Sequence, residues 1–220
     1  MSRAVVTGAN RGIGLELARQ LVARGDTVAA TCRATSAELN ALDVDVFENV
    51  DVGDQQSVAD FARRLGDEPI DMLINNAGIL TSEELDSLDW DRLRRQFEVN
   101  TLGPLRVIST LIPRMAESGK IGILTSRVGS MADNSSGGMY GYRISKAGAN
   151  MVGVNLAHDL KPRGIAVFLL HPGYVKTGMT RGQGFTDPDE AARGLIERMD
   201  ALTLADTGTF WHANGERLPW

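Results

Sequence analysis

The sequence contains a single cysteine and no long apolar run. Cys32 has no second cysteine with which to form an internal disulfide or a cysteine-based zinc site, and such a composition suits a reducing compartment. No stretch approaches the roughly 20 consecutive apolar residues of a transmembrane helix, and the N-terminus lacks the pattern of a signal peptide. We therefore expect a cytoplasmic protein that makes no use of a membrane.

An excess of positive charge is also absent. Lysine and arginine number 23 against 28 aspartate and glutamate residues, which leaves a formal net charge of -5. Such a chain has no general attraction to nucleic-acid backbones or anionic membranes, so neither is expected as a partner. The three histidines His158, His171 and His212 are scattered without ligand spacing, and no metal site is predicted. The acidic residues from Glu83 to Asp91 are interpreted as solvated decoration of a loop and a helix start.

What the chain has in abundance is a regular alternation of two patterns. Runs rich in β-branched residues, typical of strands, lie at residues 4–7, 27–31, 44–50, 70–74, 121–124, 165–170 and 207–211. Helical patterns lie between most of them, at residues 14–21, 58–65, 90–115, 145–160 and 189–199. Apolar strands separated by helices favour a parallel sheet covered on both faces. We predict an α/β fold: one doubly wound, Rossmann-type parallel sheet of about seven strands with helices on both faces, in a single domain over residues 1–220.

A glycine-rich turn directly follows the first predicted strand. Its glycines stand in the pattern Gly-x-x-x-Gly-x-Gly, and a helix begins at once. Glycines allow a tight turn and let backbone N–H groups and a helix N-terminus approach a pyrophosphate closely. The turn residues expected to bind a dinucleotide are Gly8, Asn10, Arg11, Gly12, Ile13 and Gly14. A plain strand-to-helix turn is the alternative, because the spacing departs from the commoner Gly-x-Gly-x-x-Gly fingerprint.

The end of the second predicted strand indicates which dinucleotide. Proteins that bind NAD typically carry an acidic residue there to hold the ribose 2′-hydroxyl, whereas this chain has Arg33. Arg33 and Arg11 together suit the additional 2′-phosphate of NADP(H) through charge-assisted hydrogen bonds. The alternative is two solvated surface arginines. We predict NADP(H) as the cofactor.

Tyr142 and Lys146 form a candidate proton-transfer pair. Residues four apart on a helix share a face, so the phenol and the ammonium meet. A neighbouring cation stabilises phenolate, and we expect Lys146 to lower the pKa of Tyr142 toward a range useful for acid or base catalysis. Tyr140 is the rival tyrosine, but the residue four positions beyond it is Ile144, which cannot assist a phenolate. By itself, Tyr-x-x-x-Lys also occurs by chance on surface helices.

Taken together, these motifs resemble the classical short-chain dehydrogenase/reductase family over essentially the whole chain. Further matches are Asn75-Asn76-Ala77-Gly78 after the fourth strand, Asp51-Val52 after the third, Asn100, and Pro172-Gly173 with Val175 and Thr177. The resemblance implies that Asp51 and Val52 contact the adenine. It also implies that Pro172, Gly173, Val175 and Thr177 hold the nicotinamide carboxamide. It implies that Asn76, Ala77 and Gly78 lie in the cofactor site and that Asn100 supports a relay water.

The resemblance also implies a catalytic serine, for which two residues compete. The usual separation from the tyrosine favours Ser130, whereas the family's Ser-x-x-Gly pattern at the end of a strand favours Ser126. We choose Ser126 and keep Ser130 as the reserve. Either serine could instead only cap a turn.

Within the family, residues 137–143 and 215–220 look like the C-factor and sniffer-type carbonyl reductases. The catalytic set Asn100, Ser126, Tyr142 and Lys146 then implies NADPH-dependent reduction of a small-molecule ketone or aldehyde. The alternative is an NADP(H)-binding signalling or sensor protein with little turnover. An epimerase or dehydratase of the extended branch needs a longer C-terminal region. The resemblance leaves monomer, homodimer and homotetramer open.

Overall fold

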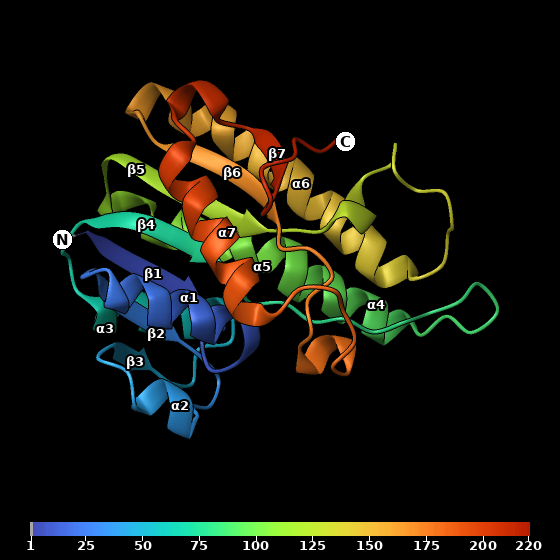
Figure 1. Ribbon diagram of the computed structural model, residues 1–220, viewed down its shortest axis with the longest axis horizontal. Coiled ribbons are helices and arrows are strands. Elements are labelled where there is room, and N and C mark those ends of the chain that lie inside the picture. Colours follow the sequence, from blue (N-terminus) through green and yellow to red (C-terminus); the bar gives the residue numbers. More distant parts are fainter. Residues whose placement is uncertain (1) are drawn as a thin grey trace.

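A seven-stranded sheet forms the centre of the molecule, which we describe over residues 2–220 from a computed structural model (Figure 1). The strand order is β3-β2-β1-β4-β5-β6-β7, and every neighbouring pair is parallel. The strands are β1 (Arg3–Thr7), β2 (Thr27–Thr31), β3 (Asp45–Phe47), β4 (Ile70–Asn75), β5 (Met115–Leu124), β6 (Ala166–His171) and β7 (Thr209–His212). The predicted doubly wound parallel sheet is confirmed.

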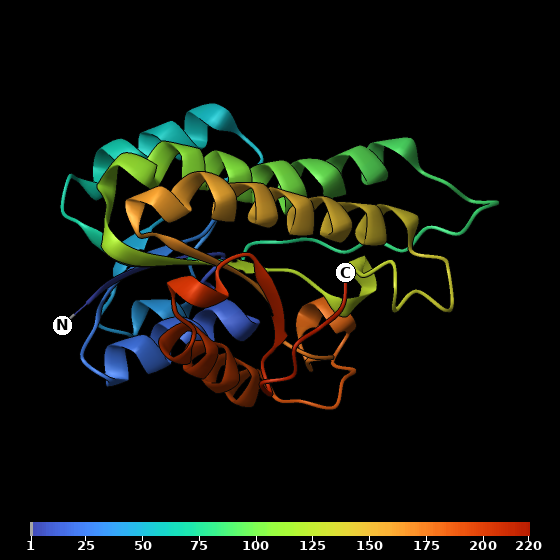
Figure 2. The same cartoon turned by 90° about the horizontal axis from the view of Figure 1, so that it is seen from above.

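Helices cover both faces of the sheet, as the view from above shows (Figure 2). One layer contains α1 (Gly12–Ala23) and α7 (Pro188–Ala201). The opposite layer contains α3 (Gln55–Leu65), α4 (Trp90–Phe97), α5 (Gly103–Leu111) and α6 (Tyr140–Leu160), and the short α2 (Ala37–Asn40) follows β2. The sheet separates two apolar cores, one under each helix layer, because successive strand residues point to opposite faces of the sheet. Val167 and Leu169 pack with the α3, α5 and α6 layer, whereas Phe168 and Leu170 pack with the α1 and α7 layer.

The helical run predicted over residues 90–115 is confirmed as far as Arg114, but it is not one regular α-helix. A π-helical segment, Glu98–Leu102, separates α4 from α5, and a 3-10 turn, Ile112–Arg114, ends the run before β5 begins at Met115. Pro104 and Pro113 stand in the first turns of the two later segments, where a residue without a backbone N–H costs least. Single π-helical turns inside a helix occur often at functional sites. Here the turn contains Asn100.

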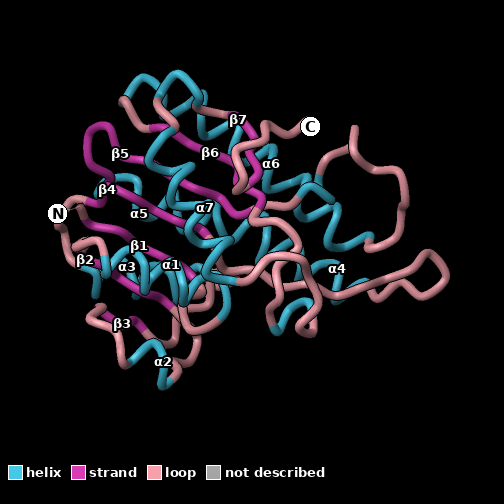
Figure 3. The backbone as a smooth tube through the Cα atoms, in the orientation of Figure 1, coloured by secondary structure: helices cyan, strands magenta, loops and turns pink. Residues whose placement is uncertain are grey.

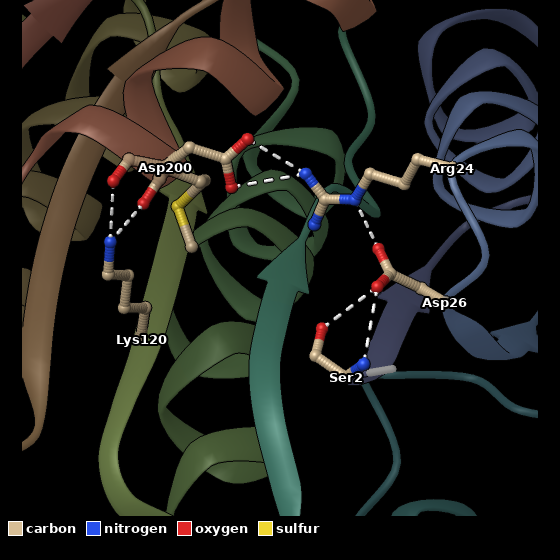
Figure 4. A network of polar contacts seen from close by, with 6 residues as sticks. Ser2, Arg24, Asp26, Lys120 and Asp200 are labelled. Carbon is tan, nitrogen blue, oxygen red and sulfur yellow. Dashed lines mark hydrogen bonds and ion pairs between the residues drawn. The ribbon is translucent and has the colours of Figure 1, made fainter.

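A polar network joins β5, α7 and the turn between α1 and β2 at the amino-terminal edge of the sheet (Figure 4). Lys120 of β5 donates to the carbonyls of Met199, at 2.7 Å, and Asp200, at 2.9 Å, near the end of α7. The Asp200 carboxylate pairs with Arg24 at 2.8 Å, and Arg24 also pairs with Asp26. Positive charge near a helix C-terminus satisfies carbonyls that the helix leaves unpaired. The network therefore links β5 to the end of α7 and to the turn after α1 at this edge of the sheet.

The long connections gather at the other edge. Residues 76–89, 125–139 and 172–187 follow the carboxyl ends of β4, β5 and β6 and extend beyond the sheet (Figure 3). Ligands of doubly wound sheets bind at this edge. Among the residues described, no helix is long and apolar enough to cross a membrane.

Candidate active site

A cavity of about 550 Å³ lies at the carboxyl edge of the sheet. It is lined by most residues that the sequence predicts to bind a dinucleotide: Gly8, Asn10, Arg11, Gly12, Ile13, Gly14, Arg33, Asp51, Val52, Asn76, Ala77, Gly78, Tyr142, Lys146, Pro172 and Thr177. Gly173, Val175, Asn100 and Ser126 lie outside this lining. The structure thus brings together motifs from five separate strand ends in one hollow.

The glycine turn closes on the segment after β4. Gly8 has a left-handed φ of +68°, and a Cβ there would lie 2.9 Å from the Cα of Ala77. A Cβ on Gly14 would collide with the carbonyl oxygen of Gly8. The Asn76 amide donates to the carbonyls of Thr7, at 2.9 Å, and Gly8, at 3.0 Å. Glycine is therefore required on steric grounds, and the backbone forms the cavity wall.

The two arginines predicted to bind the 2′-phosphate both line this cavity. Arg11 and Arg33 are both exposed, and they line the cavity from the glycine turn and from the residues after β2. Asn10 donates to the carbonyl of Ala34 at 3.0 Å, which ties these two segments together. Solvated guanidinium groups that face one hollow can bind a phosphate there.

Tyr142 and Lys146 line the same cavity, and Ser126 lies beside Tyr142 just outside the lining. Tyr142 and Lys146 lie in the first turns of α6, and the Lys146 Nζ stands 5.6 Å from the Tyr142 ring centroid. Lys146 also donates to the carbonyl of Leu124 at 2.8 Å. The Ser126 hydroxyl lies close enough to the Tyr142 phenol to favour its ionised form. The helix begins at Tyr140, earlier than the predicted residue 145, so both side chains belong to one regular helix.

Burial controls the ionisation of this group. It raises the pKa of Tyr142 to about 12, against the opposing effect of the nearby Ser126 hydroxyl. Burial also lowers the pKa of Lys146 to about 8. Removal from water disfavours the charged form of each group. The expectation that Lys146 lowers the tyrosine pKa is therefore not met, because burial dominates both groups; the phenol stays protonated at neutral pH.

Asn100 connects the cavity wall to the helix of Tyr142. Its side-chain oxygen accepts from the Ile79 N–H at 2.9 Å, and its amide donates to the Ile79 carbonyl at 2.8 Å and to the Ser145 hydroxyl at 3.0 Å. The side chain is 1% exposed. These contacts fix the segment after β4 against α6.

The reserve serine lies in a different environment. The Ser130 side chain is 1% exposed, and its hydroxyl accepts from the Asp133 N–H at 3.1 Å. It therefore stabilises a turn. Ser126 stands at the start of the 3-10 turn Arg127–Gly129, and its hydroxyl also caps a turn, by accepting from the Val128 N–H at 3.4 Å. Unlike Ser130, however, it influences the ionisation of the Tyr142 phenol.

Comparison with known proteins shows which family the chain belongs to. A family model described as short chain dehydrogenase matches residues 2–186. The chain belongs to this family. A Rhodococcus sp. (strain AD45) relative, 1-hydroxy-2-glutathionyl-2-methyl-3-butene dehydrogenase, is 47% identical with 100% of each chain covered. The C-signal protein of Myxococcus xanthus is 37% identical over 73% of this chain and 98% of its own length. An NADPH-bound carbonyl reductase from chicken fatty liver superposes with a TM-score of 0.91 at 27% identity, covering 100% of this chain and 99% of its own.

As a short-chain dehydrogenase, the chain carries one cavity-lining arginine that no sequence pattern signals. Arg95 of α4 pairs with the Asp51 carboxylate at 2.6 Å, and the Gly53 N–H donates to the same carboxylate at 2.8 Å. Burial raises the pKa of Asp51, but these two contacts outweigh it and the pKa is lowered. The other lining residues outside the predicted cofactor and catalytic set are Cys32, Ala34, Val50, Ile79, Val99, Leu124, Thr125, Gly178 and Met179.

Glu83 is not the solvated residue that the sequence indicates. It is 2% exposed, and its carboxylate accepts from the Thr81 hydroxyl and, at 3.2 Å, from the Gln96 amide. A Cβ on Gly141 would lie 3.1 Å from this carboxylate. A carboxylate beside a helix N-terminus is electrostatically favourable. In this short-chain dehydrogenase Glu83 therefore supports the start of α6, whose own first turn has no acidic residue.

Proposed function

We propose that the protein reduces a ketone or aldehyde with NADPH, within one domain that spans residues 1–220. The observation that carries the proposal is that one cavity is lined by the glycine turn, Arg11 and Arg33 together with Tyr142 and Lys146. Its volume of about 550 Å³ and its mixed polar and apolar lining suit a dinucleotide cofactor whose reactive end meets the proton donor.

The cavity fits an NADP(H) molecule in a defined direction. The cradle that a Cβ on Gly8 or Gly14 would fill suits the pyrophosphate at the start of α1. Arg11 and Arg33 would bind the 2′-phosphate, and Asp51 with Val52 would contact the adenine. Pro172, Gly173, Val175 and Thr177 would hold the carboxamide.

When bound, the reduced nicotinamide supplies a hydride to the carbonyl carbon. Ser126 hydrogen-bonds the carbonyl oxygen, where negative charge develops. Tyr142 donates its phenolic proton to that oxygen, and its pKa of about 12 keeps the proton in place until then. Lys146 stabilises the phenolate that remains. Asn100 holds the segment after β4 against α6, through Ile79 and Ser145.

The test measures NADPH oxidation against a panel of ketones and aldehydes, with Tyr142→Phe as the matched variant. We expect turnover by the wild type and a loss of about 10²- to 10⁴-fold in Tyr142→Phe, while NADPH binding is retained. Full activity in the phenylalanine variant would overturn the assigned proton donor.

A second candidate is the reverse reaction on a thioether alcohol. The 47% identical Rhodococcus dehydrogenase, covered over its whole length, favours it because its name specifies a glutathionyl alcohol. Oxidation of 1-hydroxy-2-glutathionyl-2-methyl-3-butene with NADP⁺ or NAD⁺ tests this candidate directly. Retained NADPH binding without turnover in either direction would instead support a signalling role, which the C-signal relative represents.

A further inference from the structure

The last residues of the chain form a hairpin with β7. The His212 N–H donates to the Glu216 carbonyl, and the Leu218 N–H donates to the Phe210 carbonyl, both at 2.8 Å. Trp211 forms an antiparallel bridge with Arg217. We call residues 209–220 the C-terminal hairpin. Its contacts with the segment that follows β5 connect it to the candidate active site.

The C-terminal hairpin holds the loop that follows the proposed catalytic serine. Arg127, the next residue after Ser126, pairs with Glu216 at 2.6 Å. The Ala132 N–H donates to the Trp220 carbonyl at 2.8 Å. We call residues 126–133 the serine loop. Two contacts, one ionic and one of the backbone, thus join its two ends to the hairpin.

The hairpin is itself anchored to the sheet. The Trp220 ring stacks on Phe210, with centroids 5.5 Å apart and planes 17° from parallel. Phe210 is 1% exposed and lies in the core of the α6 layer, and Leu218 is 5% exposed in the same core. Stacked aromatic pairs contribute energy beyond their buried area. This packing therefore fixes the positions of Glu216 and of the Trp220 carbonyl relative to the sheet.

The opposite side of the serine loop rests on α6. A Cβ on Gly129 would lie 2.7 Å from the backbone carbon of Lys146. Arg143 donates to the Val128 carbonyl at 3.3 Å. Within the loop, Arg127 also pairs with Asp133 at 3.3 Å. The serine loop is thus held between the helix of Tyr142 and the C-terminal hairpin.

We propose that Glu216 and Trp220 are positioning residues, which hold the serine loop so that Ser126 reaches both the Tyr142 phenol and the carbonyl oxygen. The proposal rests on the proposed function of Ser126. Glu216 contacts Arg127 of the serine loop, and Trp220 contacts Ala132 and Phe210, so we expect these two residues to act on the carbonyl step and to leave NADPH binding unchanged. Small displacements of a positioned catalytic group cost rate steeply.

The test uses Trp220→Ala, which removes the stack, and Glu216→Gln, which removes the charge opposite Arg127. Trp220→Phe retains a stacking ring and serves as the rescue variant. Arg217→Gln, an exposed change on the same return strand, is the matched control. Hydrogen exchange of the serine-loop peptide, measured without cofactor or substrate, reports its fixation independently of turnover. Steady-state kinetics then give kcat/KM for the carbonyl substrate and, separately, KM for NADPH.

In Trp220→Ala we expect faster exchange in the serine loop and a fall of about tenfold in kcat/KM for the carbonyl, with an unchanged KM for NADPH. Trp220→Phe should recover most of this loss. Glu216→Gln should lower kcat/KM by about threefold, because its ion pair is half exposed. Exchange that stays at the wild-type rate, or an equal effect in Arg217→Gln, would overturn the proposal.

Failure of the proposed function is distinguishable from failure of this inference. If the wild type itself lacks NADPH-linked turnover, the proposed function fails, and hydrogen exchange still decides whether the hairpin fixes the serine loop. If the wild type turns over and exchange rises without any kinetic change, the hairpin does not position Ser126.

Discussion

The Lys146 ammonium lies against the face of the Tyr142 ring, 5.6 Å from its centroid, while it donates to the Leu124 carbonyl at 2.8 Å. A cation over an aromatic face is attracted to the ring, and the carbonyl fixes its position. Both side chains lie on the first turns of α6 and line the cavity, Tyr142 partly buried and Lys146 buried. Their ionisation is therefore set by burial more than by each other, which leads to a pH dependence.

Carbonyl reduction should decline above the pKa of Lys146. Burial lowers this pKa to about 8, so the ammonium loses its charge as the pH rises through that value. Tyr142, with a pKa raised to about 12 by burial, stays protonated over the same range. Because kcat/KM reports groups of the free enzyme, its logarithm should fall above about pH 8. Lys146→Arg should move the break upward, since guanidinium stays charged; a flat wild-type profile from pH 6 to 10 would contradict this.

The two serines should respond differently to alanine. Ser126→Ala removes the hydroxyl that lies beside the Tyr142 phenol, and we expect kcat to fall by about 10²-fold or more, as for loss of one oxyanion donor. Ser130→Ala removes a turn contact to Asp133 and should cost about 1 kcal/mol of stability with little change in kcat. Steady-state kinetics and urea unfolding of both variants check this. The reverse pattern would make Ser130 the catalytic serine.

Arg33 should determine the choice between NADPH and NADH. Arg33→Asp replaces a cation at the cavity rim with an acid that can bind a ribose 2′-hydroxyl. Loss of one charge-assisted contact corresponds to a decrease of about 10- to 100-fold in kcat/KM for NADPH, with NADH unaffected or improved. Arg92→Gln, exposed on α4, is the control. Unchanged NADPH affinity in Arg33→Asp would show that the arginine is only a surface residue.

His171 should make the fold sensitive to acid. Burial, with help from the nearby charges of His212, Arg127 and Lys146, lowers its pKa from 6.5 to about 3. The unfolded chain therefore takes up this proton first as the pH falls below 6.5, and the free energy of unfolding decreases between pH 6.5 and 3. At pH 4.5 the loss is on the order of 2–3 kcal/mol.

Urea unfolding at pH 7 and 4.5 tests this loss. His171→Asn should lose less stability than the wild type over that interval, because the carboxylates shared by both proteins contribute equally. His158→Asn, exposed on α6, should behave like the wild type. An identical pH dependence in the wild type and His171→Asn would mean that His171 is not the acid-sensitive group.

The sequence by itself determined the features that depend on neighbouring residues. Alternating strand and helix patterns predicted the parallel sheet, because each pattern reflects how one segment buries its apolar side chains. The glycine turn and the spacing of Tyr142 and Lys146 were readable for the same reason: a turn and a helix face are local geometry.

Only the tertiary structure decided the contacts between distant segments. The burial of Glu83, the pairing of Arg95 with Asp51, and the hold of Trp220 on the serine loop join residues far apart in sequence. No periodicity reports such pairings, because they arise when the sheet brings separate strand ends together. The pKa of Tyr142 belongs to the same class: its spacing from Lys146 predicts a neighbour, whereas the cavity walls set how much water reaches either group.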